Sequence, residues 1–182
     1  MYDYNPLSAA EVTAATIEGR RQMNEAFSLL KKHDPDFREL ELIASSGVLG
    51  IRESRRILGE YYLSDEDVIN GTHFEDDITE TRFGIDIHPK AGRAQVCRKT
   101  RPCGIPFRCL IPQKTEGLLV AGRCISGSHL AMAAYRVTGN CCAMGEAAGK
   151  AAAYLTKHGG SFRTLTPETI RTHISTPVKI VK

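Results

Sequence analysis

The sequence predicts a chain of mixed helix and strand, of the α/β class and α+β when taken alone. A long amphipathic helix begins near Ser8, and short runs rich in β-branched and aromatic residues follow residue 40. An apolar stretch at 117–121 then leads into a helix of unusually small residues. With 182 residues, of which 42% are hydrophobic and 25% charged, the chain has an ordinary globular composition.

The first helix has recognisable signals at both ends. Ser8 stands three residues before Glu11, which is the spacing of a capping box. The basic run 31–33 favours the negative end of the helix dipole, and Asp34-Pro35 ends the helix. The apolar residues of one face are Val12, Ala15, Met23, Phe27 and Leu30.

The region from about 40 to 112 predicts mainly antiparallel sheet. Runs such as "ELIASSGVLGI", "RRILGEYYL" and "RFGIDIH" are separated by Gly, Asn and Asp. Ser64 and Asp67 indicate a short capped helix within it, and the polar residues 89–100 indicate a loop. Prolines on either side hold "CGIPFRCLIP" in an extended conformation.

Residues 117–158 predict a buried strand at 117–121 and a helix over 140–158 that ends at Gly159-Gly160. A shorter helical run, "AMAAY", lies between them, and Thr166-Pro167 begins a helix in the tail. One face of the 140–158 helix carries almost no side-chain bulk, which indicates close packing, either on a sheet or against a ligand. Its small residues are Cys141, Gly145, Gly149 and Ala153, with Ala148 and Ala152 alongside.

The start of that helix is the more informative feature. "RVTGN" places Thr138, Gly139 and Asn140 where free backbone N–H groups and the positive dipole end face outward. An anionic or electron-rich group fits there. Strand, "AGR" turn, Gly/Ser loop and small-faced helix together indicate a cofactor lying across the helix N-terminus.

At these residues the sequence resembles the FAD-dependent oxidoreductases that have a glutathione-reductase-like flavin domain. The similarity lies in "GLLVAGRCIS", the following "SH" and "RV...C..MG.AAG.AAA", and upstream in "IPFRCLIP", "IDIH" and "GVLGIRESRRILGEYYLSDEDV". It covers most of residues 40–155 and implies the C-terminal part of a two-domain FAD/NAD(P)-binding flavoprotein. It implies a substrate-side region at 1–112, an FAD-binding segment at 113–160 and a tail at 161–182.

The resemblance also implies the roles of individual residues. The FAD-binding segment supplies Gly122, Arg123, Arg136, Val137, Thr138, Gly139 and Asn140, although Arg136 is equally suited to a structural role. Helix-end donors there would stabilise the negative charge of the reduced flavin. The candidate catalytic residues are His129 and His88, either of which would take a proton from a hydroxylated substrate while hydride leaves for flavin N5, and Arg52, which would hold the substrate.

One part of the family pattern is missing, because no G-x-G-x-x-G turn is present to hold the dinucleotide pyrophosphate. We therefore expect an incomplete FAD site in this chain and no turnover in isolation. The expected partner is the N-terminal dinucleotide-binding half, and self-association into a homo-oligomer is a further expectation.

Two alternatives from other functional classes remain open. "GNCCA" resembles a nucleophile elbow, with Cys141 as a thiolate at a helix N-terminus, so a cysteine-dependent hydrolase is possible. Equally, the chain fits a non-catalytic subunit that completes a partner's flavin site.

Composition and charge exclude several classes. The net charge of +3 comes from interspersed acids and bases, which argues against a nucleic-acid interface. The apolar runs are too short for a membrane span and the first residues lack a secretory signal, so we expect a cytoplasmic protein, with a leader on a longer gene product left open. We expect the six cysteines to be free thiols, and their spacing indicates no metal site.

Overall fold

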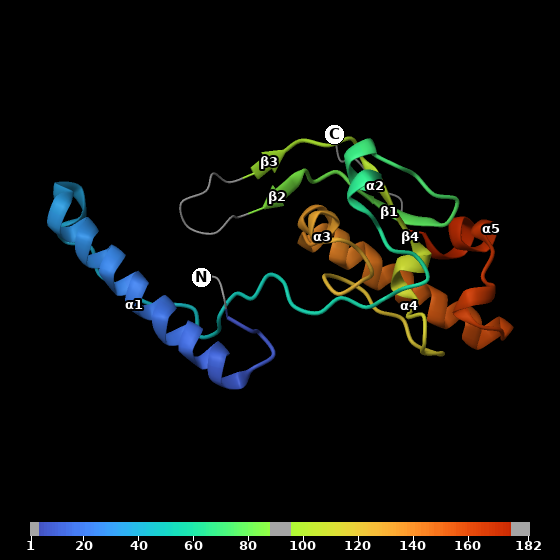
Figure 1. Cartoon of the computed structure of the whole chain (residues 1–182), viewed down its shortest axis with the longest axis horizontal. Coiled ribbons are helices and arrows are strands. Elements are labelled where there is room, and N and C mark those ends of the chain that lie inside the picture. Colours follow the sequence, from blue (N-terminus) through green and yellow to red (C-terminus); the bar gives the residue numbers. More distant parts are fainter. Residues whose placement is uncertain (1–3, 88–95, 176–182) are drawn as a thin grey trace. The chain divides into compact units, whose positions relative to one another are not determined.

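The computed structural model describes residues 4–87 and 96–175, and the chain separates into two units, 1–54 and 55–182. The helices are α1 (Ala9–His33), α2 (Asp65–Asn70), α3 (His129–Tyr135), α4 (Thr138–His158) and α5 (Pro167–Thr169). The strands are β1 (Asp77–Thr81), β2 (Ile85–Ile87), β3 (Val96–Arg98) and β4 (Cys103–Pro106) (Figure 1). This mixture of helices and small antiparallel sheets agrees with the α+β expectation.

The first unit is built on α1, whose ends lie where the sequence signals predict them. The Ser8 side chain accepts from the Glu11 N–H, as expected of an N-cap, but the Glu11 carboxylate accepts from the Asn5 N–H at 2.7 Å and not from Ser8, so only half of the predicted capping box is formed. At the other end the Asp34 N–H donates to the Leu30 carbonyl, and a 3-10 turn, Pro35–Phe37, follows. Capping therefore sets both ends of the helix.

The second unit contains two antiparallel strand pairs. β1 pairs with β4, with Glu80 opposite Gly104, and β2 pairs with β3, with Asp86 opposite Cys97. The predicted loop over 89–100 is therefore wrong at its end, because Val96–Arg98 forms a strand. The residues that precede this strand, 88–95, lie outside the described part.

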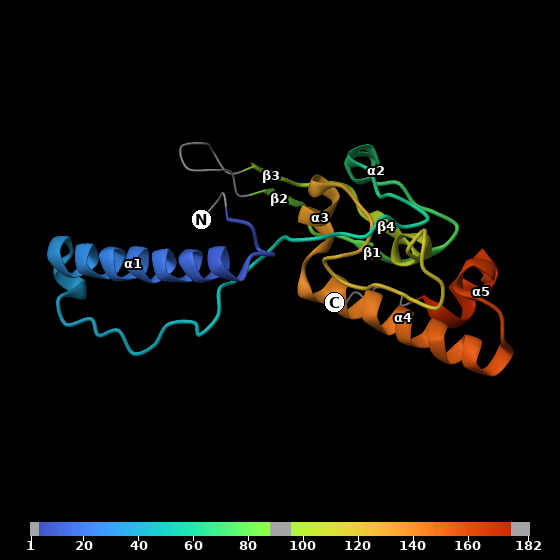
Figure 2. The same ribbon diagram turned by 60° about the horizontal axis from the view of Figure 1, so that its bottom comes forward.

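Helix α4 contributes one face to the core of the second unit. Its inner face buries Met144, Ala147 and Ala151, and it packs on β1 and on a π-helical turn, Ile170–Ile174 (Figure 2). The helix begins at Thr138, two residues before the predicted start, and ends at Gly159, which has φ +73°. The outer face is open, since no atom lies within 4 Å of a Cβ placed on Gly145 or Gly149. Tight packing of helix on sheet therefore does not explain those glycines within the described chain.

The expected strand at 117–121 is not formed. Its one backbone hydrogen bond to another described segment runs from the Val120 N–H to the Leu110 carbonyl at 2.9 Å, and Leu118 is 45% exposed. A strand needs a ladder of such bonds along a neighbour. The described residues place no second strand beside this segment, so it remains extended and irregular.

The sheet predicted for 40–112 is also shorter than expected, because residues 40–63 form isolated bridges instead of strands. Gly59 bridges Pro112 and Leu63 bridges Gly127. Backbone groups of this segment bond to several different stretches, for example the Ile57 N–H to the Cys124 carbonyl, so no regular ladder develops. Likewise "FRCL" is a 3-10 turn, Phe107–Leu110, and not extended.

Among the described helices, none is both long enough and apolar enough to cross a bilayer.

Candidate functional site

The predicted flavin segment begins at a glycine turn. Gly122 has φ +87°, a left-handed conformation that side chains rarely adopt, and its carbonyl accepts from the Ile125 N–H at 3.4 Å. A Cβ placed on Gly122 would lie 3.8 Å from the Cys141 sulfur in the first turns of α4. The structure therefore brings the predicted Gly122–Arg123 turn against the start of the predicted helix.

The N-terminus of α4 has no side-chain cap. Val137 precedes the helix with extended backbone, and its carbonyl accepts from the Cys141 N–H at 3.0 Å. The first-turn N–H groups of Thr138, Gly139 and Asn140 have no acceptor within the helix itself. Since no atom lies within 4 Å of a Cβ placed on Gly139, the space beside these groups is open.

Asn140 carries the clearest sign of a missing ligand. Its side-chain Nδ2 is buried, yet no described residue accepts a hydrogen bond from it. Buried amide donors are nearly always hydrogen-bonded in folded proteins, and leaving one without an acceptor is costly. The helix start thus offers backbone donors and one unsatisfied side-chain donor.

Arg136, between α3 and α4, has a partner. Its Nη2 donates to the Asp86 carbonyl at 2.8 Å and lies 3.5 Å from the Asp86 carboxylate. This contact fixes the helix junction to β2, which packs beside α3. The structural role considered for Arg136 is therefore present, and a contact with a cofactor stays a prediction.

The three candidate catalytic residues come from different parts of the chain. His129 is the first residue of α3 and is exposed, after the N-cap Ser128. Arg52 is exposed in the first unit. His88 lies outside the described residues and directly follows β2. Because Arg52 and His129 belong to different units and His88 is not described, their assembly into one catalytic site stays a prediction.

Comparison with known proteins decides the family. The sequence model of the FAD dependent oxidoreductases matches residues 1–174, nearly the whole chain. The chain belongs to the FAD dependent oxidoreductase family. FAD is accordingly its cofactor, and the unsatisfied donor and open space at the start of α4 fit such a group. No curated protein and no solved structure matched the chain.

In this FAD dependent oxidoreductase the Cys141 thiol does not have the features of an activated nucleophile. Burial is the main cause that raises the pKa of Cys141, and the nearby Arg123 guanidinium only partly opposes it. The sulfur also lies 3.5 Å from the Arg136 carbonyl oxygen, an acceptor that favours the thiol over the thiolate. Both observations work against the cysteine-hydrolase alternative, whose nucleophile must be a thiolate.

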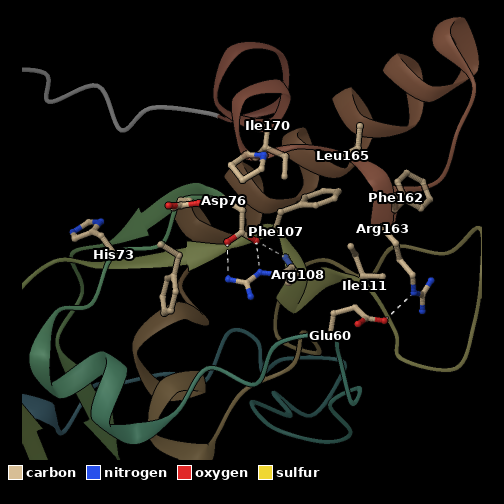
Figure 3. A pocket seen from close by; sticks show the side chains of 13 residues that line it. Glu60, His73, Asp76, Phe107, Arg108, Ile111, Phe162, Arg163, Leu165 and Ile170 are labelled. Carbon is tan, nitrogen blue, oxygen red and sulfur yellow. Dashed lines mark hydrogen bonds and ion pairs between the residues drawn. The ribbon is translucent and has the colours of Figure 1, made fainter.

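Sequence reasoning missed a pocket of about 550 Å³ in the second unit (Figure 3). Its wall comes from Glu60, residues 73–76, residues within 107–111 and residues within 162–170. Two ion pairs line it: Arg108 with Asp76, and Arg163 with Glu60 at 2.8 Å. No short motif could have revealed it, because these stretches are up to about 100 residues apart and meet only in the fold.

Proposed function

We propose that residues 113–160 hold the isoalloxazine end of FAD at the start of α4, in an enzyme that oxidises a small hydroxylated substrate. The observation that carries this proposal is the buried Asn140 Nδ2 without an acceptor. The positive φ of Gly122 and the open space beside Gly139 support it, because both let a ring approach the backbone closely.

When bound, FAD would supply the hydride acceptor, its N5 atom. The residues of this chain would stabilise charge, take up a proton and orient the substrate during this transfer. Helix-end N–H groups of Thr138, Gly139 and Asn140 would stabilise negative charge at the edge that they face, because the dipole is fixed before the reaction begins. His129 or His88 would take the substrate hydroxyl proton, and Arg52 would orient the substrate.

The proposed organisation has residues 1–112 on the substrate side, 113–160 at the flavin and 161–182 as a tail. A dinucleotide-binding half would complete the site by holding the pyrophosphate and adenosine, so the chain alone would be inactive. Support comes from the exposed Leu118 and the open outer face of α4, both in the segment that this half would contact. The same surfaces fit a non-catalytic subunit that completes a partner's site.

The decisive experiment measures flavin content with and without a fused dinucleotide-binding segment. We expect weak FAD binding to the 182-residue chain by calorimetry and a yellow fusion protein with flavin absorbance. Tight binding to the chain alone would contradict the proposed division of the site.

Two substitutions test the contact itself. Gly139→Val should leave the melting temperature of the chain nearly unchanged, because nothing in the chain occupies the space, yet should displace FAD from the fusion protein. Asn140→Asp should lower FAD content by removing the donor at nearly constant shape. Unchanged flavin content in both variants would show that the start of α4 is not the contact.

A further inference from the structure

The pocket in the second unit is separate from the proposed flavin segment, because none of the residues predicted to bind FAD lines it. Its volume of about 550 Å³ is that of a small-molecule site. Its lining combines apolar side chains with charged ones, as such sites do (Figure 3). The chemistry of its lining indicates which class of ligand it would take.

The two arginines at the pocket are already engaged. Arg108 donates through Nε and Nη2 to the two carboxylate oxygens of Asp76, each at 3.0 Å. Arg163 binds Glu60, Glu116 and the carbonyls of residues 112 and 113. Acidic side chains outnumber arginines in the lining, since Glu75 adds a third carboxylate. A phosphate or carboxylate ligand would therefore meet net negative charge.

Three charged or polar residues of the lining nevertheless keep hydrogen-bonding groups that a ligand could use. Arg108 Nη1 and the Glu75 carboxylate form no hydrogen bond with a described side chain, although the Arg108 guanidinium lies over the Tyr61 ring. His73 uses Nδ1 for Asp77 at 3.0 Å, which leaves Nε2 3.9 Å from the Glu80 carboxylate, beyond hydrogen-bond distance. The lining thus offers hydrogen-bond donors and an acceptor. Hydroxyl groups match such a lining, because each can both donate and accept a hydrogen bond.

The walls between these groups are apolar. Phe74 and Phe162 are partly exposed, and Leu165 lies near Phe162 in the same wall (Figure 3). Such faces take up the C–H surface of a ring. A ring with hydroxyls on its edge and C–H groups on its faces therefore matches both the polar and the apolar residues of the lining.

We propose that this pocket binds an uncharged, polyhydroxylated ring compound, a saccharide or another cyclic polyol. Its hydroxyls accept from Arg108 and donate to Glu75, while one ring face covers Phe162. The paired arginines stay with their carboxylates, so the ligand gains nothing from carrying an acid group.

Calorimetry and saturation-transfer NMR on the 182-residue chain without flavin test this, with methyl glucoside, cellobiose and glucuronate as probes. We expect the neutral sugars to bind with dissociation constants of about millimolar and glucuronate to bind about tenfold more weakly at low salt. Because no flavin takes part, the result is independent of the proposed oxidoreductase function. No binding of any neutral sugar, or tighter binding of glucuronate, would overturn the proposal.

Variants locate the site. Phe162→Ala should weaken sugar binding about tenfold by removing a ring face. Phe83→Ala, the same change at a 43% exposed residue outside the pocket, should leave it unchanged. If Phe162→Ala unfolds by circular dichroism, Glu75→Gln at an exposed residue provides the test: discrimination against glucuronate should fall about threefold. Equal effects of Phe83→Ala and Phe162→Ala, or unchanged discrimination in Glu75→Gln, would contradict the assignment.

Discussion

The carboxylate of Asp76 holds both the backbone and the side chain of Arg108. Its Oδ2 accepts from the Arg108 backbone N–H at 3.1 Å and from Nε at 3.0 Å, while Oδ1 accepts from Nη2. The Asp76 carbonyl also accepts from the Phe107 N–H at 2.9 Å. One residue before β1 therefore fixes the turn that follows β4, and the guanidinium lies 5.0 Å from the centre of the Tyr61 ring.

Replacing Asp76 by Asn should destabilise the second unit. The Asp76 side chain is only 6% exposed, so the substitution weakens three hydrogen bonds that involve a buried charge and leaves Arg108 without its counter-ion. We expect a loss of about 2 kcal/mol in the free energy of unfolding, reduced because Arg108 itself is half exposed. Urea unfolding measures it.

The matched control for that change is Glu146→Gln, which removes the exposed ion pair between Glu146 and Lys150 on α4. Surface pairs of this kind contribute little, so we expect a change below about 0.5 kcal/mol. Equal losses in the two variants would show that burial of the Asp76 carboxylate is not what makes the contact strong.

The Asp76 contact also shows why part of the fold could not be predicted from sequence. Local signals were sufficient where neighbouring residues along the chain determine the structure. The caps at Ser8 and Ser64 and the glycine end of α4 are confirmed. The turn at "FRCL" instead depends on a hydrogen bond to the Asp76 carboxylate, 32 residues earlier in the chain. Residues 117–121 would form a strand only beside a neighbouring strand. Such partners are a matter of tertiary context, which overrides local propensity.

Gly104 and Gly145 should respond to alanine with opposite signs. A Cβ on Gly104 in β4 would collide with the Asp77 carboxylate, whereas a Cβ on Gly145 in α4 meets no atom within 4 Å. Gly104→Ala should cost about 1 kcal/mol of unfolding free energy, because the Asp77 carboxylate would have to move aside and weaken its contacts with the Phe74 N–H and His73. Gly145→Ala should gain about 0.5–1 kcal/mol, because alanine is the better helix former. Thermal and urea melts compare them, and a stabilised Gly104→Ala would refute the contact with Asp77.

The Asp77 carboxyl should make stability depend on pH. Burial raises the pKa of Asp77 above its usual value, and the Phe74 N–H and His73 only partly oppose this. The folded chain therefore holds the proton more tightly than the unfolded chain. Its stabilising contribution is present below the unfolded pKa of about 3.9 and is lost as pH rises through the raised folded pKa.

Asp77→Asn isolates this effect, because asparagine cannot ionise. Relative to the variant, the wild-type free energy of unfolding should fall as pH rises above the unfolded pKa of about 3.9. Urea unfolding of both proteins across that range measures the difference. A difference that stays constant, or that grows in favour of the wild type as pH rises, would contradict a raised Asp77 pKa.

The candidate site was predictable to a similar, partial degree. Small residues around Gly122 and Gly139 indicated a close approach to backbone, and the structure brings the Gly122 turn against the start of α4. The sequence did not reveal that Arg136 is engaged by Asp86, since that contact joins residues 50 positions apart. Nor did it reveal the unsatisfied Asn140 amide, because burial of a single atom depends on the whole fold.

The isolated chain should self-associate through the surface around Leu118. This side chain is 45% exposed in an extended segment with little backbone pairing, and the outer face of α4 bears glycines at 145 and 149 with open space beside them. Apolar surface next to free backbone groups attracts a partner strand or a second copy. Light scattering after size exclusion should therefore show a mass that rises with micromolar concentration.

Leu118→Lys should shift the chain toward monomer, because a charge in the contact must be desolvated when two copies meet. Ile69→Lys, at a 38% exposed position on α2, is the control and should leave the mass distribution unchanged. A wild-type chain that stays monomeric at every concentration would show that the exposed surface around Leu118 does not drive self-association. That result would also remove the exposed Leu118 as support for a dinucleotide-binding half docking there, while the FAD contact at the start of α4 would still stand or fall on its own variants.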